Sequence, residues 1–547
     1  MMKQRSFLAI AFMAISFTLT YGQQTVVEND FNVVYTKSDI TIQFNQQSDF
    51  VTNAIDVTSK LPISIKKEGN NFILEDLKPS EIIRLEYQST NQKTATAKTT
   101  YLATPSVSSG TINVYFNHEV NTSYAQIQPA VNLSNTLDDM LITYINACQS
   151  TMDIAIYNSS SPSSTTGIVG AINAAYARGV QVRLIYDAST SSSMLSLLNS
   201  NIPTLGRPDV ANGGIMHNKF VIFDANNSDP NKPYVWTGST NWTTAQIDGP
   251  DKNSAIVIQD QALALGYKIE FEEMWGSNTM IPDANLAKFG STKTDNTPHN
   301  YIIGGKTINS YFSPSDNATS KIIQCINSAN SDIEIATMVL TRSDISTAIT
   351  NKYSAGLTNI NIVMDTQNPT GNKFTVLEAA LLPSHVVKFT NSGIMHHKFM
   401  VVDNFNAASD PLVLLGSHNW SSAAENSNDE NTLIVHDLNI ANQYYQAFAW
   451  MYLDAGGTML ATPQFETNEF AVYPNPTNSD FTIRTKNNDA LENATIKVYD
   501  MLGKCVFTNQ YTSLTDERVS LNSQATGLYF VKIESNGKSW SYKLIKE

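Results

Sequence analysis

The chain has 547 residues, too many for one ordinary domain, and hydrophobic residues make up 42% of it, which excludes a largely disordered chain. The formal net charge at pH 7 is −14, which argues against a protein that coats nucleic acid through a global basic face but leaves room for a small basic site. Three cysteines in this length exclude a disulfide-dense scaffold.

Residues 1–22 have the pattern of an export signal. Lys3 and Arg5 precede a short apolar run, and Gly22 supplies a small residue at a suitable cleavage point. The run is too short for a membrane span, and no later stretch offers the ~20 apolar residues that such a helix needs. We therefore expect an exported protein with no stable membrane span.

Residues 24–104 predict a small β-sandwich, because apolar and polar residues alternate between turn signals. The strand pair around residues 71–87 resembles the late strands of a fibronectin type III domain. The segment contains no titratable cluster, so we expect a spacer or adhesion module.

Residues 105–462 repeat one pattern of secondary structure. The first copy predicts helices at 136–149 and 166–178 with strands at 152–157 and 180–187, and the second predicts helices at 317–330 and 343–355 with strands at 332–336 and 360–365. Such alternation is typical of α/β lobes. We predict two tandem lobes, residues 105–290 and 291–462, that form a pseudo-twofold core with a cleft between them.

Each lobe contains the same set of polar residues, and His396 follows its counterpart in the first copy by 179 residues. The first copy supplies His217, Lys219, Asp224, Ser239 and Asn241, and the second supplies His396, Lys398, Asp403, Ser417 and Asn419. A duplication retained only for core packing would not need to repeat five polar residues.

The spacing within the motif indicates a site for a phosphodiester anion. Because alternate residues of a strand share a face, His217 and Lys219 should point one way, whereas Asn218 and, in the second copy, His397 should point the other way. Two lobes would then offer two imidazoles and two ammonium groups to one phosphorus atom. One imidazole could attack phosphorus and the other could protonate the leaving oxygen, while the lysines and motif asparagines hold the non-bridging oxygens.

The two-copy His-x-Lys-x4-Asp pattern with its Gly-Ser-x-Asn turns is similar to the phospholipase D superfamily. The resemblance implies a covalent phosphohistidine, no cofactor, no required metal, and hydrolysis or transfer of a phosphodiester by a monomeric catalytic core. By this analogy His217 is the nucleophile and His396 the general acid, although the sequence does not decide which way round they act. The resemblance also implies that Asp224 and Asp403, which complete the catalytic motif, support their lobes rather than touch substrate.

The first copy departs from the family pattern. The family often places an acidic residue shortly after the Gly-Ser-x-Asn turn, where it orients a histidine. Glu430 fits this position in the second copy, but Lys252 stands where an acidic residue would align in the first, with Asp251 displaced by one residue. We predict Glu430 and Asp251 as the orienting residues; without Asp251, one imidazole would be held less firmly.

Residues 465–547 predict another small β domain. The Tyr-Pro-Asn-Pro opening at residues 473–476, the stretch at residues 498–503 and the basic tail resemble the type A C-terminal sorting domain of the type IX secretion system. The resemblance implies export by the secretion machinery, followed by removal or surface attachment of this domain. A generic β-sandwich appendage is the alternative.

Together these patterns predict a secreted or surface-attached phosphodiesterase of the phospholipase D type that acts on phospholipids. The alternative enzyme is an extracellular endonuclease, because the same chemistry serves nucleic acids, although the negative net charge disfavours it. A third interpretation is a surface binding or adhesion protein without turnover, which the departure at Lys252 favours.

Overall fold

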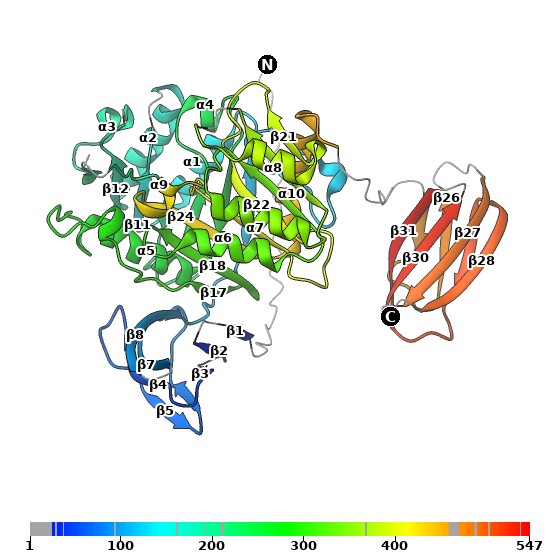
Figure 1. The fold of residues 1–547 in the computed structure, drawn as a ribbon, viewed down its shortest axis with the longest axis horizontal. Helices are drawn as coiled ribbons and strands as arrows, with labels where there is room; N and C mark the ends of the chain where they lie inside the picture. Colours follow the sequence, from blue (N-terminus) through cyan, green and yellow to red (C-terminus); the bar gives the residue numbers. More distant parts are fainter. Residues whose placement is uncertain are drawn as a thin grey trace, which may run out of the picture. The chain divides into compact units, whose positions relative to one another are not determined.

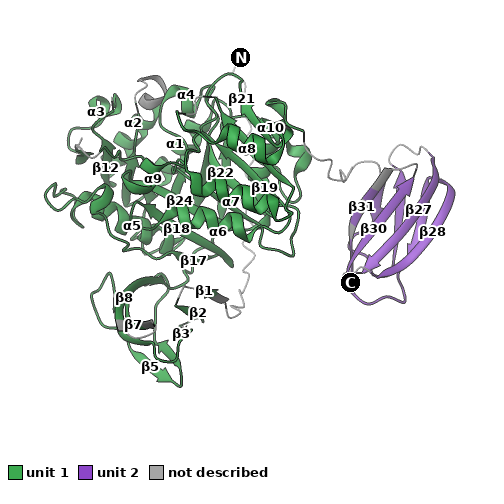
Figure 2. Cartoon of the chain, viewed as in Figure 1, with its two compact units in different colours: residues 1–458 green, residues 459–547 purple. Residues whose placement is uncertain are grey.

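The computed structural model describes residues 24–27, 30–36, 38–91, 94–159, 162–190, 192–208, 213–366, 369–458, 470–485, 490–500, 504–535 and 538–547. The chain forms two compact units, residues 1–458 and 459–547 (Figure 2). The expected export signal lies outside the described residues. Within the described ranges, no helix is both long and apolar enough to cross a membrane.

The N-terminal region consists of two small sheets that share one core. The first sheet has the order β1 (Gln24–Val27), β2 (Phe31–Tyr35), β3 (Ile40–Phe44), β6 (Asn71–Leu74) and β5 (Ile65–Glu68), and the second has the order β4 (Phe50–Asp56), β7 (Ile82–Asn91) and β8 (Thr94–Ala103). Burial alternates along β2, because successive side chains of a strand point to opposite faces. Ile302 of the second lobe packs into the same core, which attaches this region to the α/β core.

The first lobe is built on an eight-stranded mixed sheet (Figure 1). Its strand order is β10 (Val131–Asn132), β9 (Ile112–Phe116), β16 (Ser254–Ile258), β15 (Tyr234–Gly238), β14 (Lys219–Phe223), β11 (Thr151–Ile156), β12 (Gln181–Asp187) and β13 (Thr204–Arg207). Its helices are α1 (Leu137–Ala147), α2 (Pro162–Ala177), α3 (Met194–Leu197), α4 (Thr244–Ile247) and α5 (Gln261–Trp275). Apolar residues of α1 and α2 share a core with the sheet.

The second lobe repeats this architecture and thereby confirms the predicted fold class. Its strand order is β17 (Asn300–Ile303), β18 (Lys306–Ser313), β24 (Glu430–His436), β23 (Leu412–Gly416), β22 (Lys398–Val402), β19 (Ile333–Thr337), β20 (Ile360–Asp365) and β21 (Val386–Phe389). Its helices are α6 (Ala318–Ser328), α7 (Ser343–Ser354), α8 (Phe374–Leu381), α9 (Ser422–Asn426) and α10 (Leu438–Asp454). The helices and strands predicted from periodicity occur close to their expected bounds; α2 begins earlier than expected, at Pro162, because proline is favoured in a first helical turn.

The last helix of each lobe packs between the two sheets. Tyr267 of α5 lies edge-on to Phe220 of the first lobe and to Phe312 of the second, with ring centroids 5.2 and 5.0 Å apart. The counterpart on α10 repeats the arrangement with the rings of Tyr444, Phe116 and Phe399. Such aromatic pairs stabilise by about 0.5–1.5 kcal/mol beyond the area they bury. The two lobes therefore share an apolar core, which fixes how their motifs face each other.

The C-terminal unit has two sheets around a core of its own. The first contains β25 (Phe470–Tyr473), β26 (Asp480–Thr485) and β29 (Asp516–Ser520), and the second contains β28 (Cys505–Leu514), β27 (Leu491–Asp500), β30 (Gly527–Ser535) and β31 (Lys538–Lys546).

Candidate active site

Each motif histidine lies on a short stretch of backbone that pairs with the opposite lobe. The amide of His217 donates to the carbonyl of Asp429 at 2.9 Å, and the amide of Asp429 donates to the carbonyl of Ile215 at 2.9 Å. The reciprocal contact joins the amide of His396 to the carbonyl of Lys252 at 2.9 Å. The two lobes thus exchange equivalent segments, and this exchange brings both motifs to one site.

The glycine at the start of each motif is required by this exchange. A Cβ atom at Gly214 would lie 1.9 Å from the carbonyl oxygen of Ser427, and one at Gly393 would lie 2.0 Å from that of Pro250. Gly393 also has a φ of +86°, which favours glycine. Any side chain at either position would push the lobes apart.

Two buried aspartates, which the sequence analysis did not single out, anchor the same segments. Asp187 ends β12 and accepts the amide of Met216 at 2.6 Å, and Asp365 ends β20 and accepts the amide of Met395 at 2.7 Å. Their recurrence at the ends of two predicted strands was a signal that could have identified them.

The imidazole of His217 is held by a carboxylate of the other lobe. Its Nδ1–H donates to Oε2 of Glu430 at 2.7 Å, and the hydroxyl of Ser417 donates to the same oxygen at 2.7 Å. Asn428 donates to Oε1 at 3.1 Å. Because a carboxylate only accepts hydrogen bonds, the proton of the neutral ring lies on Nδ1, and Nε2 keeps a free lone pair.

The imidazole of His396 is held by an amide instead. Its Nδ1–H donates to Oδ1 of Asn253 at 2.9 Å, and the hydroxyl of Ser239 donates to the same oxygen at 3.0 Å. The Nδ2 group of Asn253 donates to the carbonyl of Gln246 at 3.1 Å, which fixes the orientation of the amide. The neutral ring of His396 therefore also carries its proton on Nδ1.

These contacts correct the predicted alignment of the two copies. Lys252 and Asp429 hold equivalent places in the two backbone contacts between lobes, so the residue that follows each is also equivalent. The counterpart of Glu430 is therefore Asn253 and not Lys252. The first copy has an amide at the position where the second has a carboxylate.

The prediction that Asp251 orients a histidine is wrong. Its carboxylate accepts the backbone amide of Ile394 at 2.8 Å, while the Nδ1 atom of His396 is bound by Asn253. Asp251 precedes Asn253 by two residues and holds the backbone of the motif segment rather than its imidazole.

The two motif lysines are buried beside the imidazoles. Lys219 Nζ donates to the carbonyl of His217 at 2.7 Å, and Lys398 Nζ donates to that of His396 at 2.7 Å. Burial lowers the pKa of Lys219 to about 7, although the charge of Glu430 raises it. Burial, followed by the charge of Lys219, lowers the pKa of Lys398 well below its usual value. A bound anion would favour the charged form of both lysines.

The surroundings of both imidazoles favour the neutral form. Burial lowers the pKa of His217 to about 4, although the charge of Glu430 raises it. Burial and then the charges of Lys398, Lys219 and His217 lower the pKa of His396 well below its usual value. The mutual influence of these four motif side chains reflects their convergence on one site.

The serines and asparagines of the Gly-Ser-x-Asn turns differ in their surroundings. The hydroxyl of Ser239 donates to Asn253 Oδ1, and that of Ser417 donates to the carboxylate of Glu430. These bonds favour a role in holding the histidine partners over direct contact with phosphate. The Oδ1 atoms of Asn241 and Asn419 are buried and have no hydrogen-bond partner within the described ranges. Phosphate binding by the two asparagine amides remains a prediction.

The motif aspartates do not join the imidazoles. Asp224 follows the far end of β14, five residues or about 17 Å along the strand from Lys219. Its carboxylate accepts the backbone amide of Ser150 at 2.6 Å, and Asp403 accepts that of Ser331 at 2.7 Å. Their φ values of 54° and 55° lie in the left-handed region, where aspartate is tolerated better than most residues. Each aspartate caps the turn that leads into the strand beside its motif strand, β11 in the first lobe and β19 in the second.

Two further side chains flank the lysines at equivalent positions after β11 and β19. The ring of Tyr157 lies 4.8 Å from that of His217 and 5.2 Å from Lys219 Nζ. In the second lobe the sulfur of Met338 lies 3.8 Å from Lys398 Nζ. The sequence analysis missed both residues, because the two copies share no residue type there.

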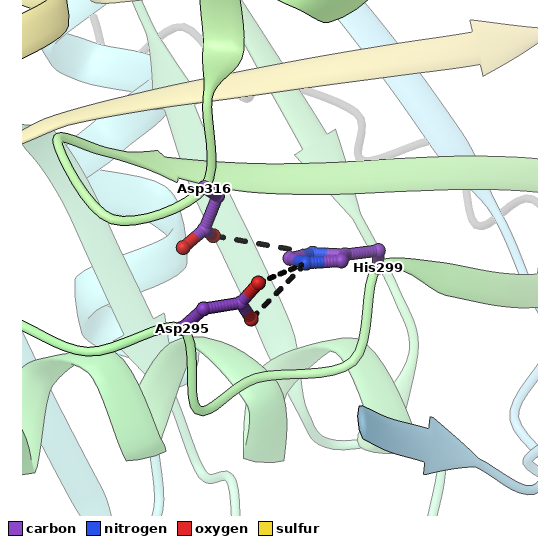
Figure 3. A group of neighbouring side chains, drawn as sticks. All are labelled: Asp295, His299 and Asp316. Carbon is purple, nitrogen blue, oxygen red and sulfur yellow. Dashed lines mark hydrogen bonds and ion pairs between the residues drawn. The ribbon is translucent and has the colours of Figure 1, made fainter. Parts of the chain in front are cut away.

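Asp295, His299 and Asp316 form the group in the described chain whose residue types fit a metal site, with potential ligand atoms within 4.8 Å of one another (Figure 3). His299 Nε2 faces Asp295 at 3.1 Å, whereas Nδ1 donates to the carbonyl of Ser310 at 3.0 Å and lies 3.9 Å from Asp316. Burial lowers the pKa of His299, but the hydrogen bond with Asp295 and the charges of Asp316 and Asp295 outweigh it and raise the pKa to about 9. The protonated imidazole therefore pairs with the exposed carboxylate of Asp295 and lies near the buried carboxylate of Asp316, in a partly exposed ion cluster.

Comparison with known domain families gives two matches. Residues 141–275 and 322–452 match the family described as cardiolipin synthase, PLD-like domain. Residues 471–547 match the family described as secretion system C-terminal sorting domain. The PLD-like matches fall one in each lobe.

Curated relatives are similar over about a quarter of the chain. The mitochondrial cardiolipin hydrolase of Chlamydomonas reinhardtii is 25% identical over 147 residues, which is 25% of this chain and 58% of that protein. That of Xenopus tropicalis is 30% identical over 135 residues, 24% of this chain and 60% of the relative. A phospholipase D of Rickettsia prowazekii is 25% identical over 166 residues, 30% of this chain and 78% of the relative.

Among solved structures, the phospholipase D family member Nuc from Salmonella typhimurium is 24% identical, with a TM-score of 0.24, and the match covers 27% of this chain and 95% of Nuc. The phosphatidylserine synthase of Haemophilus influenzae is 12% identical, with a TM-score of 0.43, over 61% of this chain and 86% of the other.

Proposed function

Because this chain is a member of the phospholipase D superfamily with a C-terminal sorting domain, we propose that it is an exported phosphodiesterase that hydrolyses phospholipids through a phosphohistidine. One observation carries the proposal: two buried imidazoles, each held at Nδ1 with Nε2 free, share a site with two buried lysine side chains. The sorting domain indicates export and surface attachment.

The proposed reaction has two steps. The Nε2 lone pair of one histidine attacks phosphorus, the bond from phosphorus to the leaving oxygen breaks, and that oxygen takes the Nε2 proton of the other histidine. The second histidine then removes a proton from water, whose oxygen attacks phosphorus. The bond between phosphorus and nitrogen breaks, and its electron pair returns to the first imidazole. Lys219 and Lys398 stabilise the charge that grows on the non-bridging oxygens.

Phospholipid is the substrate class we favour. The curated relatives described above are cardiolipin hydrolases and a phospholipase D, and the net charge of −14 opposes non-specific attraction of a polyanion. A phospholipid molecule carries its phosphodiester alone, whereas a nucleic acid strand carries a long run of them. A nucleic acid would need a local basic track that outweighs this charge.

The test incubates the purified chain with phosphatidylcholine vesicles and, in parallel, with plasmid DNA, with and without a chelator. We expect release of choline in both conditions and intact plasmid. His217→Ala and His396→Ala should each lower lipid hydrolysis by at least about 100-fold. Cleavage of plasmid alone would favour the nuclease, full activity in either variant would contradict the two-histidine reaction, and no turnover of either substrate would favour a binding protein.

A further inference from the structure

We infer that His118 is a positioning residue: its imidazole binds His397 across the contact between the lobes and thereby holds the second motif at the candidate phosphate site. The inference rests on the proposed phosphodiesterase activity and gives a role to a buried histidine pair that the proposed reaction does not use. It also predicts that acid weakens this attachment.

The two imidazoles meet where the lobes pack together. The Nε2 atoms of His118 and His397 are 2.7 Å apart, and both residues are buried. The Nδ1–H of His118 donates to the carbonyl of Glu119 at 2.7 Å, so Nε2 of the neutral ring is an acceptor and His397 donates its Nε2–H. The Nδ1 atom of His397 has no hydrogen-bond partner in the described chain, so His118 is the side chain that fixes this ring.

His397 connects this contact to the motif. It stands between His396 and Lys398, and adjacent side chains of extended backbone point to opposite faces. Its carbonyl accepts the amide of Met338 at 2.8 Å, while the amide of His396 donates to the carbonyl of Lys252 at 2.9 Å. Because one rotation of the backbone sets both faces, a side chain held behind the motif also sets the direction of the imidazole and the lysine in front.

The residues just after β9 hold both sides of the backbone contact between the lobes. The Oδ1 atom of Asn117 accepts the amide of Asn253 at 2.8 Å, and its Nδ2 group donates to the carbonyl of Asp251 at 2.8 Å. Asn117 thus holds the segment of the first lobe, and His118 holds the segment of the second lobe that pairs with it. Loss of the His118 imidazole would leave the second of these segments less firmly held.

The first motif lacks this attachment. The residue equivalent to His397 is Asn218, whose Nδ2 lies 3.8 Å from the sulfur of Met274 and whose Oδ1 has no hydrogen-bond partner within the described ranges. By sheet register the equivalent of His118 is Pro314, whose side chain has no donor or acceptor. One lobe therefore folds without a histidine pair, which points to a role for the pair at the second motif.

The surroundings of the pair are apolar or positively charged. The ring of Trp450 on α10 stacks on His118 with centroids 5.5 Å apart, and that of Phe116 on β9 lies edge-on at 5.7 Å. In the described chain, the charged side chains that act on the pair are Lys252 and Lys398. A proton added to either imidazole would add positive charge to a buried place whose charged neighbours are already positive.

Acid should weaken the attachment for this reason. Burial lowers the pKa of His118 to about 3, together with the charge of Lys252 and against the hydrogen bond with Glu119. Burial, followed by the charges of His118, Lys398 and Lys252, lowers the pKa of His397 well below its usual value. Because both rings bind protons more readily when the contact is open, the free energy of opening falls as the pH falls below about 6.5.

The first experiment measures the attachment without requiring activity. His118→Leu removes the acceptor, whereas His118→Gln places an oxygen near the former Nε2 and cannot titrate. At about pH 7.5, hydrogen exchange in the peptide with His396 should be at least about tenfold faster in the leucine variant and within about threefold of wild type in the glutamine variant. If His118→Leu does not fold, His397→Asn takes its place, because it installs the residue of the first motif. Exchange as slow as in wild type would overturn the inference.

The second experiment separates positioning from a purely structural role. On phosphatidylcholine vesicles His118→Leu should lower kcat by at least about tenfold and leave KM within about threefold, because it displaces reacting groups and not the bound lipid. His118→Gln should keep at least about half of the wild-type kcat, since its oxygen accepts the same hydrogen bond. The control is His385→Leu, which removes a ring bonded to the carbonyl of Ile360 at the other end of β20 and should leave kcat within about twofold.

Equal losses of kcat in the leucine and glutamine variants, or a rise in KM alone, would overturn the inference. If wild type hydrolyses no lipid, the proposed function fails, whereas the exchange experiment still decides whether His118 holds the motif.

The third experiment tests the response to acid. At about pH 5, unfolding of His118→Gln should take up about one proton fewer than unfolding of wild type, as measured from the slope of the unfolding free energy against pH. An equal slope would mean that the folded state already carries this proton, and it would overturn the neutral pair on which the inference depends.

Discussion

The two lobes place the same side chains around the candidate phosphate site and differ in what lies behind it. Each imidazole is held at Nδ1, each lysine donates to the carbonyl two residues earlier, and each lobe crosses to the other through the same backbone contact. Behind these side chains, charged residues in one copy have neutral or oppositely charged counterparts in the other. Geometry at the site is thus shared by the copies, while electrostatics is not.

One such difference lies beneath the backbone contacts between lobes. Beneath the contact made by His217, the guanidinium of Arg207 in the first lobe binds the carboxylate of Asp429 in the second at 2.8 Å, and both are buried. Beneath the contact made by His396, the equivalent places hold Phe389 of the second lobe and Lys252 of the first, and the ammonium lies 5.7 Å from the ring centre. A buried ion pair on one side is matched by a half-exposed cation on an aromatic ring on the other. The two positions differ together, which explains why Lys252 disturbs the sequence alignment without disturbing the fold.

A second difference lies on β11 and β19, the strands beside the two motif strands. Asp153 on β11 receives two hydrogen bonds from Arg183, at 2.6 and 2.8 Å. Its counterpart on β19 is Glu334, which faces Asn361 across the same strand pair and has an Oε2 atom with no hydrogen-bond partner in the described chain. The first lobe neutralises this carboxylate with a cation, whereas burial in the second raises the pKa of Glu334 well above its usual value.

The largest effect should come from breaking the ion pair between Arg207 and Asp429. Arg207→Ala leaves the Asp429 carboxylate buried with Lys293 at 3.6 Å as its remaining cation, and we expect it to destabilise the folded state by about 3–5 kcal/mol. Lys252→Ala removes a half-buried ammonium that lies against the ring of Phe389 and donates to the carbonyls of Pro250 and Ser392, and it should cost about 1 kcal/mol. Urea unfolding of both variants measures the contrast, and equal losses would show that the two sides are energetically alike.

The lysines test whether the lobes act on one phosphorus atom. Lys219→Met and Lys398→Met should each lower kcat by about 10²–10³-fold, because each removes a cation from the same growing charge. The double variant should fall well short of the product of the two losses, since residues that act as a unit are not additive. Lys219→Arg and Lys398→Arg serve as controls that keep the charge. Full activity in either methionine variant would mean that one lobe suffices.

Glu334 gives the second difference a dependence on pH. Its raised pKa means that the folded state keeps a proton that the unfolded state releases above pH 4.5, so its contribution to stability falls as pH rises from 4.5 toward the folded value. Glu334→Gln cannot titrate, and the stability of the variant relative to wild type should rise by about 1.4 kcal/mol per pH unit in that window. Urea unfolding at about pH 5 and pH 7 measures this. Parallel stabilities would show that Glu334 is already charged when folded.

The sequence predicted the parts of the molecule that follow local periodicity. The tandem lobes, their strands and the recurring motifs around Lys219 and Lys398 could be predicted because each depends on residues that are close together in the sequence. The partner of His396 was not, because it depends on how a segment of the first lobe pairs with a segment of the second. The sequence analysis aligned Lys252 with Glu430 and therefore chose the nearest acidic residue, Asp251, whereas the backbone contacts between the lobes align Asn253 with Glu430.

The smallest effects on kcat should come from Asp224 and Asp403, which both copies share but which lie far from the candidate phosphate site. Asp224 and Asp403 hold their backbone turns in the same way, about 17 Å along a strand from the lysines. Asparagine tolerates the same left-handed backbone and keeps one accepting oxygen, so Asp224→Asn and Asp403→Asn remove little besides charge. We expect each to lower stability by about 1–2 kcal/mol and to leave kcat of the folded enzyme within about twofold of wild type. Urea unfolding and initial rates on the lipid measure the two quantities separately. If kcat instead fell as far as in the lysine variants while the fold persisted, the aspartates would act on the phosphate site through the strands, and the separation of shared geometry from shared chemistry would fail.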